Sequence, residues 1–332
     1  MLICKITQYK HTNLQNTASI LCFFSIKCYF CSQNIVTMEN KREMSWFVKM
    51  LLLASFAMMM LIIVSIAIII IFGARYTGIN VQLSAIALQN ILIFMAPVFI
   101  LALICQSSEK RPIAQTMWMT KAPSFKSIVM VILVYIVALP AMNWVVDWNE
   151  GLHLPHELRA VESFLRDMED TAQGMTSDLL LTKTWGGMLV RVLLVGLLTG
   201  LGEEIFFRAG LLGSMHFGRV KRHLAVWTVA VIFSGIHMQF FGFVPRLLLG
   251  AWFGYVMLWG GEVWTPIIAH SINNSLVVVF TFLANNHYIE NNIIETLGIP
   301  EKGQQPLLAI ASMIATALVI WLFMRKKKTT ES

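Results

Sequence analysis

Long apolar runs separated by short polar segments make up most of the chain from residue 46 to residue 324. As a helix, a run of about 18 to 25 apolar residues crosses a hydrocarbon core of ~30 Å. The pattern therefore predicts an all-α fold, a polytopic transmembrane helical bundle of about eight spans. The predicted spans are residues 46–73, 81–105, 127–147, 187–212, 222–239, 245–260, 264–284 and 306–324.

Composition and charge agree with a membrane protein. Hydrophobic residues make up 57% of the chain and charged residues 13%, whereas soluble domains have roughly 45 to 50% and about 25%. The net charge is +7, but the Lys and Arg residues flank the spans, so no nucleic-acid partner is expected. Fourteen of these residues lie on the side predicted to hold both chain ends and six on the other. The positive-inside rule then predicts an integral protein of the plasma or inner membrane with cytoplasmic termini.

The N-terminal segment differs from the rest of the chain. It holds four of the five cysteines and has neither a spanning run nor a clear cleavage site. We expect residues 1–45 to form an N-terminal extension, of which residues 1–37 are either not native, lying upstream of a start at Met38, or not folded. The four cysteines are Cys4, Cys22, Cys28 and Cys31.

The long loop between the third and fourth predicted spans, residues 148–186, is acidic and falls on the outer side. Apolar residues recur in it at helical spacing near Pro155. This spacing predicts an amphipathic helix that lies on the membrane surface or caps the bundle. The apolar residues are Leu154, Leu158, Val161, Leu165 and Met168.

Polar residues interrupt the spans of the C-terminal half. Glu203 and Glu204 lie within one predicted span, His237 and His270 lie well inside later ones, and Asn274 follows one turn after His270. A charge at bilayer depth costs at least a few kcal/mol, so these residues mark a candidate functional site.

Helix geometry separates the two glutamates. Glu204 and Arg208 are four residues apart and can pair on one helix face, which lowers the cost of burying both. The side chain of Glu203 lies about 100° around the helix from that of Glu204, so its carboxylate can point away from this pair. An unpaired carboxylate can draw a proton from water, imidazoles can orient that water or bind a metal, and an amide can stabilise an oxyanion. The set therefore suits hydrolysis; the alternative is that these groups only join helices by hydrogen bonds.

Three motifs carry a resemblance to a known family. Residues 203–208 read E-E-x-x-x-R, residues 233–237 read F-x-x-x-H, and residues 270–274 read H-x-x-x-N. In order and spacing they resemble the CAAX protease and bacteriocin-processing family (CPBP, also called Abi), intramembrane endopeptidases related to the type II CAAX prenyl protease. The expected parts of the chain are N-terminal spans and outer loop at 46–184, a protease core at 185–285, and a last span and basic cytoplasmic tail at 286–332.

The resemblance implies a role for each matching residue. Glu203 would activate the attacking water with help from His237, while His270 and Asn274 would polarise the carbonyl and hold the oxyanion. The substrate would be a peptide or membrane protein that reaches the site from the cytoplasmic side or from the lipid bilayer. The supporting residues would be Glu204, Arg208 and Phe233.

The sequence leaves metal dependence open. Glu203, His237 and His270 could form a three-ligand zinc site, although an H-E-x-x-H motif is absent. We prefer a metal-free site, because His270 and Asn274 on one helical face suit an oxyanion better than a tetrahedral metal.

Two other function classes are compatible with these residues. The same fold could serve as a non-catalytic membrane partner, a regulator or an immunity protein. Alternatively, the buried acid and histidines could relay protons in a transporter, but the paired repeats typical of transporters are not evident. The complete motif set favours catalysis, since a scaffold has no need of a Glu203 outside the ion pair.

Overall fold

The computed structural model describes residues 43–72, 78–215, 219–290, 296–301 and 304–330. The chain from Met44 onward forms one unit, and every regular element in the described part of it is a helix. The predicted all-α bundle is therefore confirmed. Residues 1–42 of the predicted extension, with all four of its cysteines, lie outside the described residues.

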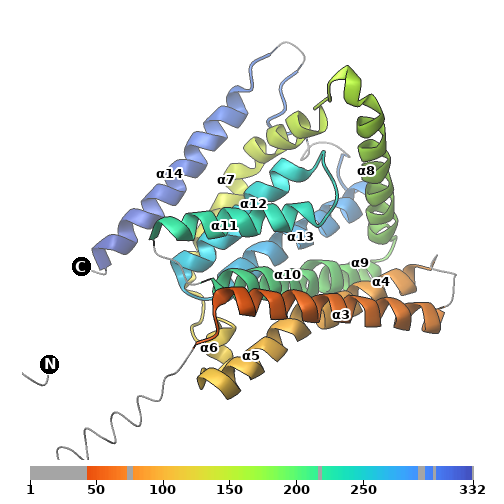
Figure 1. Ribbon diagram of the computed structural model, residues 1–332. Helices are drawn as coiled ribbons and strands as arrows, with labels where there is room; N and C mark the ends of the chain where they lie inside the picture. Colours follow the sequence, from red (N-terminus) through yellow and green to blue (C-terminus); the bar gives the residue numbers. More distant parts are fainter. Residues whose placement is uncertain (1–42, 73–77, 216–218, 291–295, 302–303, 331–332) are drawn as a thin grey trace, which may run out of the picture. The chain divides into compact units, whose positions relative to one another are not determined.

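Most helices of the unit follow one another with short connections, whereas residues 286–306 separate α13 from α14 (Figure 1). Three π-helical stretches, η2, η4 and η5, lie inside longer helices, and such stretches are frequent near functional sites. The first half holds α3 (Trp46–Phe72), α4 (Ile79–Leu88), η2 (Gln89–Met95), α5 (Ala96–Glu109), α6 (Ile113–Thr116), α7 (Phe125–Glu150), η3 (His156–Leu158) and α8 (Arg159–Leu180). The second half holds α9 (Trp185–Arg191), η4 (Val192–Leu198), α10 (Thr199–Glu204), η5 (Ile205–Leu212), α11 (Arg219–Gly235), α12 (Phe243–Gly260), α13 (Trp264–Asn285) and α14 (Leu307–Thr330).

Six helices in the described part of the chain are long and apolar enough to cross a membrane, and they coincide with six of the predicted spans. The predicted span 187–212 corresponds to the run α9 to η5, which carries Arg191 and the charged residues of the E-E-x-x-x-R motif. The predicted span 222–239 corresponds to α11, which has only 17 residues. The count of eight spans stays a prediction. The six helices are Trp46–Ile71, Ile79–Glu109, Phe125–Glu150, Phe243–Gly260, Trp264–Asn285 and Leu307–Arg325.

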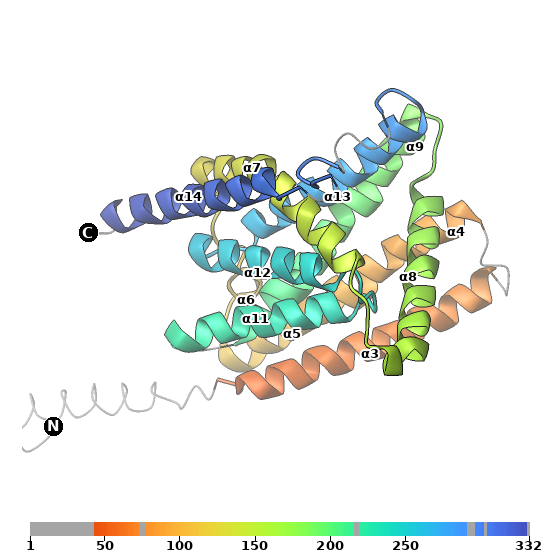
Figure 2. The same ribbon diagram turned by 90° about the horizontal axis from the view of Figure 1, so that it is seen from above.

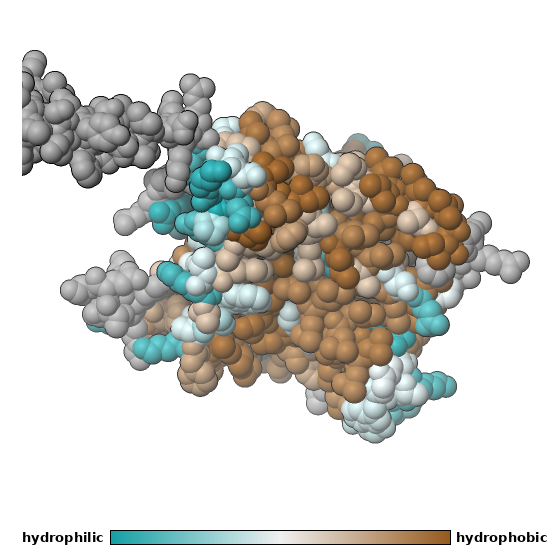
Figure 3. Space-filling model, turned by 90° about the horizontal axis from the view of Figure 1, so that it is seen from below, coloured by the Kyte–Doolittle hydropathy of each residue, from teal (hydrophilic) through white to brown (hydrophobic). Residues whose placement is uncertain are grey.

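The outside of the bundle is largely apolar. Large side chains such as Ile62, Ile70 and Ile136 are exposed, and hydrophobic residues spread over the middle of the surface while hydrophilic residues gather at its two ends (Figure 3). Such a belt is too large for a surface in water and is typical of a face that contacts lipid.

The predicted helix of the outer loop is confirmed as α8, which crosses one end of the bundle (Figures 1 and 2). It contacts α4 and α13. Leu158 and Val161, predicted for its apolar face, are 45% and 47% exposed, whereas Glu169 is buried. The helix therefore packs on the bundle through its later turns and leaves its first apolar residues exposed.

Candidate active site

Small residues bring the glutamate helix close to the histidine helix. A Cβ atom added at Gly200 would meet the Ser271 backbone N at 2.8 Å, and one added at Gly196 would meet the Ser275 side chain. Glycine at 200 is therefore needed for α10 to pack on the backbone of α13, and glycine at 196 leaves room for Ser275 beside η4. Glu203 and Glu204 follow Gly200 by one turn, so this contact sets their distance from His270.

Glu204, Arg208 and His270 form a buried charged cluster. Arg208 Nη1 donates to Glu204 Oε1 at 2.9 Å, and His270 Nδ1 donates to the same oxygen at 2.7 Å. Arg208 Nη2 also donates to Gly250 O at 3.0 Å, which joins α12 to the cluster. Glu204 and Arg208 are both 0% exposed. The pair predicted from the i, i+4 spacing is confirmed, and it also holds the His270 ring.

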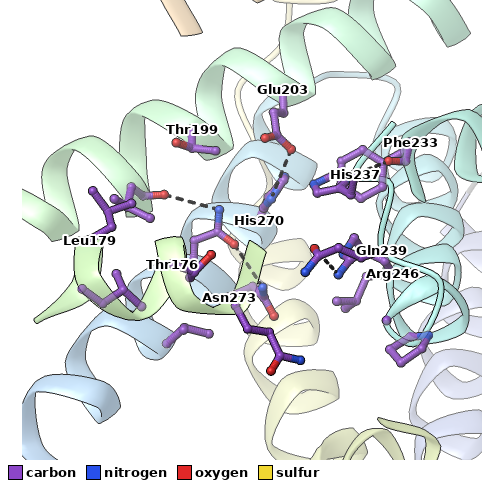
Figure 4. A pocket seen from close by; sticks show the side chains of 18 of the residues that line it. Thr176, Leu179, Thr199, Glu203, Phe233, His237, Gln239, Arg246, His270 and Asn273 are labelled. Atoms are coloured by element: carbon purple, nitrogen blue, oxygen red, sulfur yellow. Dashed lines mark hydrogen bonds and ion pairs between the residues drawn. The ribbon is translucent and has the colours of Figure 1, made fainter. Parts of the chain in front are cut away.

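Glu203 points away from Glu204 and Arg208 and lines a pocket. Its Oε2 lies 3.8 Å from His270 Nε2 (Figure 4). His270 Nδ1 carries the proton that bonds Glu204, so Nε2 is the ring nitrogen that faces Glu203. The two neighbouring glutamates thus contact opposite nitrogens of one imidazole, one as a buried partner and one across the pocket.

His237 lies in the turn directly after α11, because that helix ends at Gly235. The prediction that it lies well inside a span is wrong. The turn continues with Met238 in the left-handed region (φ 54°), which directs the chain away from the helix axis. His237 Nδ1 donates to Phe233 O at 2.8 Å and the two rings are 5.2 Å apart, so Nε2 is left for the pocket.

Asn274 lies one turn after His270, and its amide is oriented by two neighbours. Asn273 Nδ2 donates to Asn274 Oδ1 at 3.1 Å, and Asn274 Nδ2 donates to Val195 O at 3.4 Å. An amide nitrogen has two N–H groups. The second N–H of Asn274 is therefore left for another acceptor.

One cavity of about 740 Å³ joins these residues. Glu203, Phe233, His237, His270 and Asn274 all line it, so the structure brings together the residues predicted from three separate motifs. Its volume is within the range usual for ligand sites, roughly 300 to 1,000 Å³.

The sequence did not point to three further residues at this cavity. Glu169 of α8 accepts from Gln239 Nε2 at 3.1 Å and from Phe241 N at 3.1 Å, and Gln239 Oε1 accepts from Arg246 Nη2 at 2.8 Å. These contacts join α8 to the chain segment directly after the turn that holds His237. No spacing rule reveals them, because Glu169 and Gln239 are 70 residues apart.

The residues considered for zinc line the same cavity, but they do not form a metal site as placed. In the described part of the chain, no group of three or more His, Cys, Asp or Glu side chains is positioned to hold a metal ion. Glu203 and His270 approach each other, whereas His237 lies on a separate turn. We therefore derive no chemical step through a metal.

Comparison with known proteins agrees with the motifs. Residues 185–276 match the family model described as "Type II CAAX prenyl endopeptidase Rce1-like". No curated protein and no solved structure matches the chain. The matched stretch runs from α9 into α13 and holds all three motifs and the Gly200 contact, so the resemblance predicted from the sequence is confirmed. Residues 185–276 of this integral membrane protein of apolar helices are thus similar to the Rce1-like type II CAAX prenyl endopeptidase family.

Proposed function

We propose that this protein is an intramembrane endopeptidase that hydrolyses peptide bonds with a water activated by Glu203. The observation that carries the proposal is the position of the Glu203 carboxylate. It is 8% exposed, it lies outside the Glu204–Arg208 pair, and it faces His270 Nε2 across the cavity. The match to an endopeptidase family supports the same reaction.

The proposed steps use groups that already face the cavity. Glu203 takes a proton from a water molecule, and the water oxygen attacks the scissile carbonyl carbon. His237 Nε2 accepts a hydrogen bond from that water and orients it. The C–N bond then breaks, and the proton held by Glu203 passes to the leaving nitrogen.

The oxyanion that develops on the scissile carbonyl needs hydrogen-bond donors, and residues of α13 supply them. The second N–H of Asn274 is one donor, and its direction is fixed by Asn273 and Val195. His270 can be the other when its Nε2 is protonated, because Glu204 stabilises a positive ring through Nδ1. Fixed donors of this kind each contribute about 10²- to 10³-fold in rate.

Comparison of membrane proteomes tests the function. Cells with the wild-type protein are expected to contain cleaved fragments that are missing from cells with Glu203→Gln, because only the wild type has the base. The fragments should be identified by their new chain ends. If both cell types contain the same fragments while the protein has a measurable effect on the cell, the non-catalytic partner or regulator is the better assignment.

Chelation tests the metal-free version of the site. The purified protein is expected to keep its activity after prolonged incubation with a chelator, because Glu203 takes the proton directly. If zinc were required, both imidazoles would have to be unprotonated ligands, and added zinc would restore the lost activity. One zinc per active chain, lost together with activity in His270→Ala, would contradict the metal-free site.

A further inference from the structure

The residues that line the cavity come from one end of the bundle. In the helix that runs from Ile79 to Glu109 they lie in the first half, at Ile86 and Asn90, and in α7 they lie in the last turns, at Val146 and Glu150. Because α4 and α7 cross the bundle in opposite directions, the first half of one and the last turns of the other lie toward the same end. This end is the one that α8 crosses (Figures 1 and 2).

The C-terminal helices also line the cavity with the parts that lie toward the end of the bundle crossed by α8. α12 lines the cavity with its first half, from Pro245 to Phe253, and α13 does so from His270 to Thr281, its middle and later turns. α8 itself contributes residues from Glu169 to Leu180. The cavity therefore extends from the mid-depth Glu203 toward α8.

Basic side chains mark the opposite end of the bundle. They are exposed and lie before α7, after α5 and at the start of α11. Near α8, residues 147–178 instead hold eight acids and only two arginines, Arg159 and Arg166. Positive charge beside membrane spans stays on the cytoplasmic side. The exposed basic residues are Lys110, Lys121, Lys126, Lys221 and Arg222.

We propose that the cavity opens to the extracytoplasmic side, past α8, and that its substrate is an extracytoplasmic segment of a polypeptide. The identity of the substrate rests on the proposed function, whereas the direction of the opening does not. This direction differs from the cytoplasmic entry expected from the sequence, because the cavity and the basic residues lie at opposite ends of the spans.

The lining next to α8 suits a peptide. Arg246 Nη1 is buried and has no hydrogen-bond partner among the described residues, while Nη2 is held by Gln239. A buried donor without a partner calls for an acceptor, and backbone carbonyls of a peptide supply one. Thr176 and Asn273 line the same cavity and add polar groups that a hydrocarbon chain could not satisfy (Figure 4).

Cysteine accessibility in intact cells tests the opening. The five native cysteines are replaced in the full-length protein, and single cysteines are then introduced at Asn273 in the cavity, at the exposed Ser163 on α8 and at the exposed Ser107 at the basic end. A membrane-impermeant maleimide is the probe. Asn273→Cys and Ser163→Cys are expected to react in intact cells, whereas Ser107→Cys should react only after permeabilisation.

Every other pattern counts against the proposal. Reaction of Asn273→Cys only after permeabilisation, together with Ser107→Cys, would place the opening on the cytoplasmic side. Failure of Asn273→Cys to react under both conditions would mean that the cavity is closed to solute. Protection of Ser163→Cys in intact cells would show that α8 lies on the cytoplasmic side and that the chain has the opposite orientation in the membrane. Val277→Cys, which also lines the cavity, serves as a second reporter if Asn273→Cys is not produced. Labelling requires no catalysis, so these outcomes are independent of the test of function.

Discussion

Glu203→Gln is expected to lose at least about 100-fold of the proteolytic rate while the protein accumulates to nearly the wild-type level. General-base catalysis typically contributes about 10²- to 10⁴-fold, and the amide cannot take the proton from water. Glu203 is outside the Glu204–Arg208 pair, so the change leaves no buried ion without its partner. The measurements are the cleavage rate of a peptide substrate by purified protein and the amount of protein in membranes.

Glu150→Gln is the matched control. Glu150 lines the same cavity at the end of α7, so this variant also removes one carboxylate there, but far along the chain from the three motifs. Its rate is expected to stay close to that of the wild type. Equal losses of activity in both variants would show that the cavity needs negative charge in general. Full activity of Glu203→Gln would show that Glu203 is not the general base.

Arg208→Leu and Glu204→Gln are expected to lower the amount of folded protein strongly. Removing one partner of a buried ion pair typically costs about 3 to 5 kcal/mol, because the other charge stays buried without compensation. Arg208 also donates to Gly250 O, and Glu204 also accepts from His270. Each change therefore loosens contacts among η5, α12 and α13, which thermal unfolding in detergent and membrane abundance would detect.

Arg159→Leu is the control for loss of an arginine, since Arg159 is exposed on α8. It is expected to change the unfolding temperature little, as surface substitutions usually do. The double variant Glu204→Gln with Arg208→Leu should be less destabilised than the sum of the single changes, because neither charge is then left alone. Additive losses, or single variants as stable as the wild type, would show that the pair does not hold the bundle together.

The two glutamates show how neighbouring residues take different roles on one helix. The side chains of Glu203 and Glu204 leave the helix in directions about 100° apart, so one reaches Arg208 and the other the cavity. Both then approach His270, through Nε2 and Nδ1 respectively. A substitution at Glu204 should consequently affect activity as well as stability, because it removes the acceptor that orients the ring.

Local sequence determined the helices and the pairs within them. Long apolar runs must satisfy their backbone groups internally in lipid, so they form helices, and this requirement made the all-helical bundle predictable. The Glu204–Arg208 pair also follows from a spacing of four residues.

Only the tertiary structure decided which helix each site residue meets. The contact of Glu204 with His270 joins residues 66 apart, and that of Glu169 with Gln239 joins residues 70 apart. Such contacts depend on how the helices pack, which no local spacing encodes. The end of α11 at Gly235 and the direction in which the cavity extends also depend on tertiary structure. The sequence by itself therefore determined the helices and the candidate residues, whereas helix packing decided their partners and the end of the bundle toward which the cavity extends.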